Sequence, residues 1–317
     1  MPDPKLRFSF SEPDIDTQRP VVDGSVKIEG FDLEPVPKGA PWPDWDVRDH
    51  VSVGRLCGSV SGDGLVCIPA WPNRKFRTSY IYVNEKAGIE APKDLEGKRV
   101  ATQGWMGPAG VWARGALQNH YEVDLTKIHW FTQNPTATPT PPGIRIDSLP
   151  AAVEAYDAML VEGDLDAVID ANVLPSIIHR DPRVRRLFRD WKTEAQEYWQ
   201  ATHVFPISHL VTIKQEFVER YPDAPVALLK AYRQARDIAM SRVWGSDPEY
   251  LIISWANHQL AEQREVMFGE HYWPYNLEDN TATLEALTLF AYQQGLTPHR
   301  VDYHTLFHPE AAAFPGW

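Results

Sequence analysis

Residues 95–118 read LEGKRVATQGWMGPAGVWARGALQ. A short charged turn leads into Arg99–Thr102, which is predicted to be a strand, and the loop QGWMGPAG follows it. From Ala109 to Tyr121 apolar residues recur every three or four positions, which predicts a helix. A strand, a glycine-containing loop and a helix form the repeating unit of α/β proteins. In such proteins, the loops at the strand carboxyl ends bind ligands.

Similar patterns extend along the chain. Further strands are predicted at residues 5–10, 26–36, 79–84, 128–131, 165–169 and 202–213. Further helices are predicted at 149–160, 214–220, 223–243, 247–268 and 280–294, and the Pro/Thr-rich segment 132–143 is predicted to be an exposed loop. The run at 165–169 is continuously apolar, as is typical of a buried parallel strand. We expect an α/β fold of two lobes: one from 1–97 and 203–317, the other from 98–202, with the ligand cleft between them.

The net charge of the chain argues against some classes of binding partner. In 317 residues, 31 Lys and Arg stand against 43 Asp and Glu, a net charge of −12. An acidic surface repels phosphate groups, so neither nucleic acid nor a membrane surface is expected as a partner. A small acidic substrate would have to be met by a local cluster of Arg or His. A homo-oligomer remains open.

The sequence also predicts the cellular compartment of the protein. The opening residues MPDPKLRFSF hold no apolar stretch of secretory length, and no run of about 18 apolar residues occurs that would span a bilayer. The two cysteines, Cys57 and Cys67, do not make a disulfide framework. A cytoplasmic protein with reduced thiols is expected.

The strongest local motif is basic. Residues 68–84 read IPAWPNRKFRTSYIYVN, with Arg74, Lys75 and Arg77 just before a predicted buried strand. Arginine side chains at a strand end can hold a carboxylate through paired hydrogen bonds. The alternative is a turn whose charges face water.

The loop at 103–108 predicts an anion site. A glycine-containing turn that opens a helix presents free backbone N–H groups, here around Gly107, at the positive end of the helix. Trp105 could stack on a flat ligand or serve only to pack the lobe, and Arg114, one turn into the helix, is expected at the surface. The segment is neither a GxGxxG fingerprint nor a Walker motif, so nucleotide binding is not expected.

Proton transfer has two candidates. His203 and His209 flank the expected second crossing between the lobes, and either has the ordinary pKa range for a proton donor, or a structural role. Arg19 follows the mouth of the first strand. The sequence has no HxH, HExxH, CxxC or GxSxG motif, so no metal, cofactor or hydrolase triad is expected.

Four segments carry a family resemblance. These are TQRPVVDGSVKIEGFDL (17–33), IPAWPNRKFRTSYIYVN (68–84), residues 95–118 and FPISHLVTI (205–213). Together they resemble the 4,5-dihydroxyphthalate decarboxylase family, over residues from about 5 to about 300. The resemblance implies a type II periplasmic-binding-protein-like fold and decarboxylation of a hydroxylated aromatic acid without an organic cofactor. Arg74 and Arg77 match the family's basic segment, and His209 matches its proline-to-histidine segment.

The substrate implied by this resemblance dictates what a site must supply. In 4,5-dihydroxyphthalate each hydroxyl is para to one carboxylate, so its deprotonation pushes electron density to the carbon that is protonated before CO₂ leaves. A cation on the leaving carboxylate would stabilise the ground state only. Our hypothesis is that Arg74 and Arg77 hold the retained carboxylate and that His209 or His203 gives the proton. Trp105 would cover the ring, and Asp170 would polarise a phenol.

Two other functions stay open. One is a solute-binding protein that delivers a small aromatic or carboxylic acid to an ABC transporter. The other, by fold analogy alone, is an enzyme of menaquinone or thiamine-precursor synthesis. The sequence does not distinguish these by residue type, because a binder and a decarboxylase differ only in the proton donor.

Overall fold

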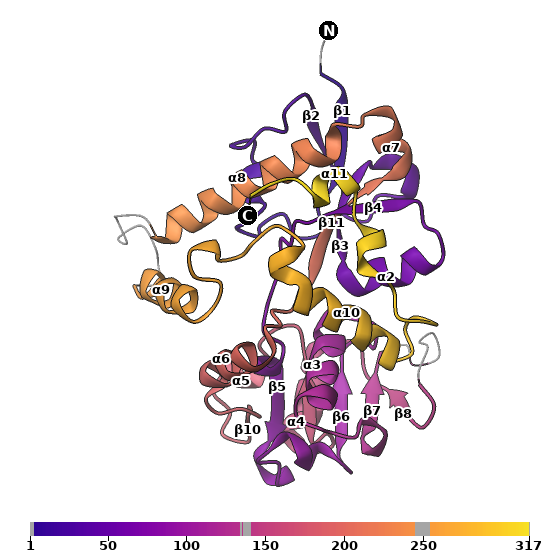
Figure 1. Ribbon diagram of the computed structural model, residues 1–317. Helices are drawn as coiled ribbons and strands as arrows, with labels where there is room; N and C mark the ends of the chain where they lie inside the picture. Colours follow the sequence, from indigo (N-terminus) through magenta and orange to yellow (C-terminus); the bar gives the residue numbers. More distant parts are fainter. Residues whose placement is uncertain (1–2, 134, 136–140, 245–253, 317) are drawn as a thin grey trace. The chain divides into compact units, whose positions relative to one another are not determined.

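The computed structural model describes residues 3–133, 135, 141–244 and 254–316. Half of the predicted 132–143 loop and the start of the predicted 247–268 helix lie outside these residues. The chain forms two compact units (Figure 1). Unit 1 comprises 1–74, 207–284 and 302–317, and unit 2 comprises 75–206 and 285–301. None of the described helices is both long and apolar enough to cross a membrane.

Unit 1 is built on a five-stranded sheet in the order β2-β1-β3-β11-β4. Its strands are β1 (Lys5–Ser9), β2 (Asp32–Val36), β3 (Val47–Val51), β4 (Leu65–Ile68) and β11 (His209–Lys214). β1 runs parallel to β2 and β3, whereas β11 is antiparallel to both β3 and β4. All six residues of β11 are buried, as expected for a strand with a neighbour on each side.

Unit 1 also contains the helices α1 (Arg19–Val22), α2 (Ser52–Val60), α7 (Gln215–Arg220), α8 (Ala224–Trp244), α9 (Ala256–Val266) and α11 (Pro309–Ala312). α9 packs on α8, and none of its residues is buried. α8 supplies most of the buried face: Leu228, Leu229, Tyr232 and Ala235 are almost fully buried, and their spacing follows the helical period. In Figure 1, α8 crosses the sheet beside β1 and β2.

Unit 2 is built on a six-stranded mixed sheet in the order β10-β5-β9-β6-β7-β8. Its strands are β5 (Ile81–Asn84), β6 (Arg99–Thr102), β7 (His129–Thr132), β8 (Arg145–Ser148), β9 (Ala167–Ile169) and β10 (Val184–Arg186). β9, β6, β7 and β8 are parallel, and β5 is antiparallel to β9 and to β10. The predicted parallel strand at 165–169 is confirmed at Ala167–Ile169 by its pairing with β6.

The helices of unit 2 are α3 (Pro108–Asn119), α4 (Val153–Glu162), α5 (Pro175–Ile178) and α6 (Trp191–Thr202). α10 (Thr281–Gln293) begins in unit 1 and belongs to unit 2 from Glu285 onward. Pro108 at the first helical position suits the start of α3, since proline lacks the N–H that a first turn leaves unpaired. Gly115 of α3 has Phe290 of α10 against it, with no room for a side chain.

The first unit boundary differs from the one expected near Gly97, whereas the second lies within the crossing expected between His203 and Ser208. The chain passes from unit 1 to unit 2 between Arg74 and Lys75 and returns between Pro206 and Ile207. The first boundary moves because β5 hydrogen bonds to β9 and β10, so residues 75–97 belong to the second sheet. Residues 285–301, expected in the first lobe, also belong to unit 2.

Candidate functional site

In unit 2, Asp170 directly follows the carboxyl end of β9. It is 3% exposed and accepts a 2.6 Å hydrogen bond from the Tyr156 hydroxyl and a 2.9 Å bond from the Asn172 backbone N–H. Burial, followed by the bond to Asp170, raises the pKa of Tyr156, so the phenol keeps its proton and donates it to the carboxylate. Sequence analysis did not identify Tyr156, which lies on α4, as a site residue.

Arg77, on the chain that leads into β5, contacts the residue that follows Asp170. It is buried, and its Nη1 donates to the Ala171 carbonyl at 3.2 Å. The Tyr80 ring centre lies 5.9 Å from the Arg77 guanidinium carbon, 5.8 Å from Lys75 Nζ and 5.7 Å from the Arg186 guanidinium carbon. Arg186, which sequence reasoning missed, therefore joins the two predicted basic residues around one aromatic ring.

A buried acid holds the turn that carries Arg77. Thr78 donates to Glu194 at 2.7 Å, and the Tyr121 hydroxyl donates to the other Glu194 oxygen. Burial raises the pKa of Glu194, although both of these hydrogen bonds oppose the rise. This contact fixes the residue next to Arg77 to helix α6.

Trp105 is 1% exposed, and one face of its ring is already covered. The Arg114 guanidinium carbon lies 3.8 Å from the Trp105 ring centre, and the Trp130 ring meets Trp105 edge-on at 5.5 Å between centroids. Arg114 is fully buried, which corrects its expected surface position. Its side chain turns back toward the start of α3, as helical side chains do, and reaches the Trp105 carbonyl.

Gly107 is the N-cap of α3 and immediately precedes its first residue, Pro108. It is half-buried, has extended backbone dihedrals, and donates its N–H to the Gly104 carbonyl at 3.0 Å. The next two residues with an N–H, Ala109 and Gly110, are buried in the first turn of the helix. The structure therefore forms the helix-opening turn on which the predicted anion site depends.

In unit 1, His209 begins β11 and is 7% exposed. Its Nδ1 lies 3.5 Å from an Asp49 carboxylate oxygen on the neighbouring strand β3. Asp49 is fully buried and also accepts from the Ser11 N–H and, at 3.3 Å, from Gln18. Tyr232 donates to Gln18 at 3.2 Å, which extends the network into α8.

Arg74 lies on the segment next to His209. The Asn73 carbonyl accepts from the Ser208 N–H at 2.8 Å and the His209 N–H at 3.3 Å. The Arg74 side chain is 4% exposed, and its guanidinium carbon lies 5.6 Å from the Phe268 ring centre. Burial lowers the pKa of Arg74 to about 9. A cation held against aromatic rings in this way gains from an anionic ligand.

His203 and Arg19 have structural contacts of their own. His203 is exposed, adopts a left-handed conformation (φ 53°) and ends α6, with its N–H on the Trp199 carbonyl at 2.7 Å. Arg19 is exposed and donates to the Asp14 carbonyl at 3.1 Å. The predicted roles of both residues in proton transfer and binding remain predictions. The buried residue in that first loop is Gln18, beside Arg19.

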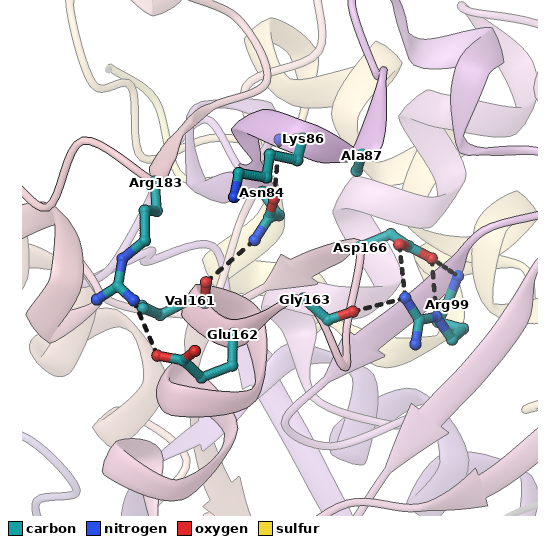
Figure 2. A pocket seen from close by; sticks show the side chains of 9 residues that line it. All are labelled: Asn84, Lys86, Ala87, Arg99, Val161, Glu162, Gly163, Asp166 and Arg183. Carbon is teal, nitrogen blue, oxygen red and sulfur yellow. Dashed lines mark hydrogen bonds and ion pairs between the residues drawn. The ribbon is translucent and has the colours of Figure 1, made fainter.

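A hollow of about 350 Å³ lies in unit 2, at the end of the sheet where β6 and β9 begin (Figure 2). Arg99 pairs with Asp166 at 2.9 Å and also donates to the Gly163 carbonyl, and Arg183 pairs with Glu162 at 2.8 Å. Asn84 donates to the Leu160 carbonyl at 2.7 Å. These bonds cap the end of α4, so the polar groups of this hollow serve the fold. The described residues hold no cluster of three metal-ligating side chains.

Comparison with known proteins places the chain in context. No family model matches it. A 4,5-dihydroxyphthalate decarboxylase of Comamonas testosteroni is 28% identical over 323 residues, covering 96% of this chain and 97% of that protein. One from Pseudomonas putida is 26% identical over 214 residues, covering 62% and 83%. The chain is thus a distant homologue of these decarboxylases, which confirms the resemblance.

Solved structures show the same fold. A putative periplasmic sulfonate-binding protein SsuA from Methylobacillus flagellatus matches with a TM-score of 0.60 at 16% identity, over 99% of this chain and 94% of that one. The aliphatic sulphonate binding protein SsuA from Escherichia coli matches at 0.57 with 14% identity, over 97% and 92%. The desulfurization enzyme DSZB matches at 0.56 with 15% identity, over 98% of each. The predicted type II periplasmic-binding-protein-like α/β fold is confirmed.

Proposed function

We propose that this protein is a carboxy-lyase that removes one carboxyl group from a hydroxylated aromatic dicarboxylic acid such as 4,5-dihydroxyphthalate. The observation that carries the proposal is the buried His209–Asp49 pair beside the Arg74 segment. A binding protein needs cations for its acid, but it has no need of a carboxylate behind a histidine. The homology with two decarboxylases supports the same reaction.

His209 is the proton donor of this proposal. Its Nδ1 lies 3.5 Å from the Asp49 carboxylate, which leaves Nε2 as the ring nitrogen that would give a proton to the substrate. The proton goes to the ring carbon that bears the leaving carboxylate. The carbon–carbon bond then breaks, its electron pair restores the aromatic ring, and neutral CO₂ departs. The overall balance is one proton taken up for each CO₂ released.

Asp170 activates the hydroxyl para to the leaving group. It is held by Tyr156 and the Asn172 N–H, and a buried carboxylate that accepts a hydrogen bond from a substrate phenol increases electron density on the ring. Arg77 and Arg74 hold the retained carboxylate, since a cation there stabilises substrate and transition state without opposing CO₂ loss. Arg186 adds a third cation near Arg77.

The test is CO₂ release from 4,5-dihydroxyphthalate by the purified protein, with ultraviolet absorbance following protocatechuate, before and after treatment with a chelator. We expect stoichiometric CO₂ and protocatechuate, unaffected by the chelator. The matched variants are His209→Asn and His203→Asn. If His209→Asn abolishes CO₂ release and His203→Asn does not, the result supports His209 as the proton donor. Tight binding of 4,5-dihydroxyphthalate without CO₂ release would contradict the enzyme and favour the solute-binding protein instead.

A further inference from the structure

Around Arg114 in unit 2, hydrogen-bond donors outnumber acceptors. Arg114 gives Nε to Gln294 at 2.8 Å and Nη2 to the Trp105 carbonyl, but its buried Nη1 has no acceptor among the described residues. The buried Trp105 Nε1 and the Thr132 hydroxyl likewise have none. Buried polar groups in native proteins are almost always paired, so unpaired donors at this density call for an acceptor from outside the chain.

These donors gather at one place in the fold. Thr102 and Thr132 end the parallel strands β6 and β7 in register, so their side chains share one face of the sheet. α3 lies over this face (Figure 1). A methyl group at Gly110 would lie 2.5 Å from Thr102 Oγ1 and 2.7 Å from Arg114 Nη1. The unpaired guanidinium nitrogen therefore lies against the first turn of α3.

The first turn of α3 adds to the positive charge. Neither the Ala109 nor the Gly110 N–H donates to a backbone carbonyl among the described residues, and a helix begins with about half a positive charge. Burial alone lowers the pKa of Arg114 to about 9, with no neighbouring carboxylate to offset it. At neutral pH Arg114 thus carries an uncompensated buried charge, which an anion would stabilise.

The covering turn is only partly buried. Gly104, Met106 and Gly107 are half-buried, while Trp105 between them is buried. Two of the three half-buried residues are glycines, which have no side chain to block a small anion.

We propose that Arg114, the first-turn amides of α3 and the Trp105 indole N–H form a carboxylate subsite in unit 2. Resting on the proposed function, it would bind the carboxylate that the product retains, the same group that the proposed function assigns to Arg74 and Arg77. The planar, two-oxygen shape of a carboxylate suits a guanidinium edge. It is a binding subsite and takes no part in proton transfer.

Isothermal titration calorimetry with non-reacting probes tests this subsite apart from turnover. The probes are phthalate and protocatechuate, which carry carboxylates, and catechol, which carries the two hydroxyls alone. In Arg114→Met we expect affinity for phthalate and protocatechuate to fall by about 10- to 100-fold, the range for a lost hydrogen bond to a charged group. Catechol binding should change by less than twofold.

Two further variants keep the test decisive. Arg114→Lys retains the charge but not the paired geometry and should recover part of the phthalate affinity; Trp105→Phe removes one N–H and should lose a few-fold. Circular dichroism confirms that each variant folds, and if Arg114→Met does not fold, these two decide. If Arg114→Met binds phthalate as tightly as the wild type does, or loses as much affinity for catechol as for phthalate, the proposed subsite is wrong. Failure of CO₂ release with phthalate binding intact overturns only the proposed reaction.

Discussion

The two ends of strand β6 carry arginines in opposite electrostatic states. At its start, Arg99 pairs with Asp166 through both carboxylate oxygens and caps the Gly163 carbonyl. Near its end, beyond Thr102, the Arg114 guanidinium is fully buried against Trp105 with no carboxylate partner. The first arginine has its charge balanced by the fold, and the second does not.

This difference separates a structural cation from a ligand-binding one. A partly exposed arginine that pairs with a carboxylate stabilises the fold by about 1 kcal/mol or less. A ligand could bind such an arginine only by displacing that carboxylate. A buried unpaired one costs stability until an anion arrives. The hollow in Figure 2 is lined by paired charges, so its volume by itself is a poor guide to function.

The His209–Asp49 pair is a third case. It places a histidine, the side chain most often used for proton transfer, 3.5 Å from a fully buried carboxylate. Such a pair suits proton transfer better than either arginine. The largest expected effect therefore lies here.

We expect His209→Asn to lower kcat for 4,5-dihydroxyphthalate by about 10²- to 10⁴-fold, the usual contribution of a general acid. KM should stay within a few-fold, because Arg74, Arg77 and Arg114 remain. Steady-state kinetics measure both constants. A raised KM with an unchanged kcat would make His209 a binding residue and leave the proton donor unassigned.

The second effect contrasts the two arginines directly. Arg114→Met should lower kcat/KM by about 10- to 100-fold, the loss of a charge-assisted hydrogen bond. Arg99→Met should leave kcat/KM unchanged within twofold, because its contacts all lie within the fold. Equal losses from both variants would mean that pairing does not distinguish their roles.

The third effect concerns stability. Arg99→Met should lower the free energy of unfolding by about 1 kcal/mol, since the Asp166 pair is partly screened by solvent and the Gly163 carbonyl loses its donor. Urea denaturation at neutral pH measures this change. The control is Arg145→Met, a strongly exposed residue of the same unit, which should change stability very little. A stability of Arg99→Met equal to that of the wild type would contradict the structural role.

The smallest effect depends on pH. Glu194 has a pKa raised by burial, so the unfolded chain releases its proton at a lower pH than the folded protein does. Stability supported by the protonated acid is therefore full below the ordinary pKa and is lost as pH rises through the raised one. Relative to Glu194→Gln, the wild type should lose stability from about pH 4.5 upward. A difference between the two proteins that does not vary with pH would reject this.

Much of the fold was predictable because its signals are local. The strand Arg99–Thr102 is confirmed at both ends, and the helix after it begins at Pro108. β3 was missed because its sequence, VRDHV, carries three polar side chains, and a proline-rich segment precedes it. Its Asp49 is buried only because β11, about 160 residues later in the chain, pairs with it.

The site was less predictable for the same reason. A charged residue on a periodic helix indicates the surface, yet Arg114 is buried by Trp105 and by Gln294, which follows α10. Tyr156 is a candidate only because it donates to Asp170. Arg186 is one only because its guanidinium lies near the Tyr80 ring, on another part of the chain. Such contacts join segments far apart in sequence, and a single sequence shows no pattern that pairs them.

The most direct test of the central claim, that an unpaired buried arginine marks the ligand site, is thermal unfolding of Arg99→Met and Arg114→Met with saturating phthalate. Ligand at 100 times its Kd adds about 2.7 kcal/mol to the folded state. We predict that phthalate at this concentration raises the Tm of Arg99→Met by as many degrees as it raises that of the wild type, and raises that of Arg114→Met by about half as much or less, because its affinity is lower by about 10- to 100-fold. An equal rise in Arg114→Met, or a rise lost only in Arg99→Met, would contradict the claim.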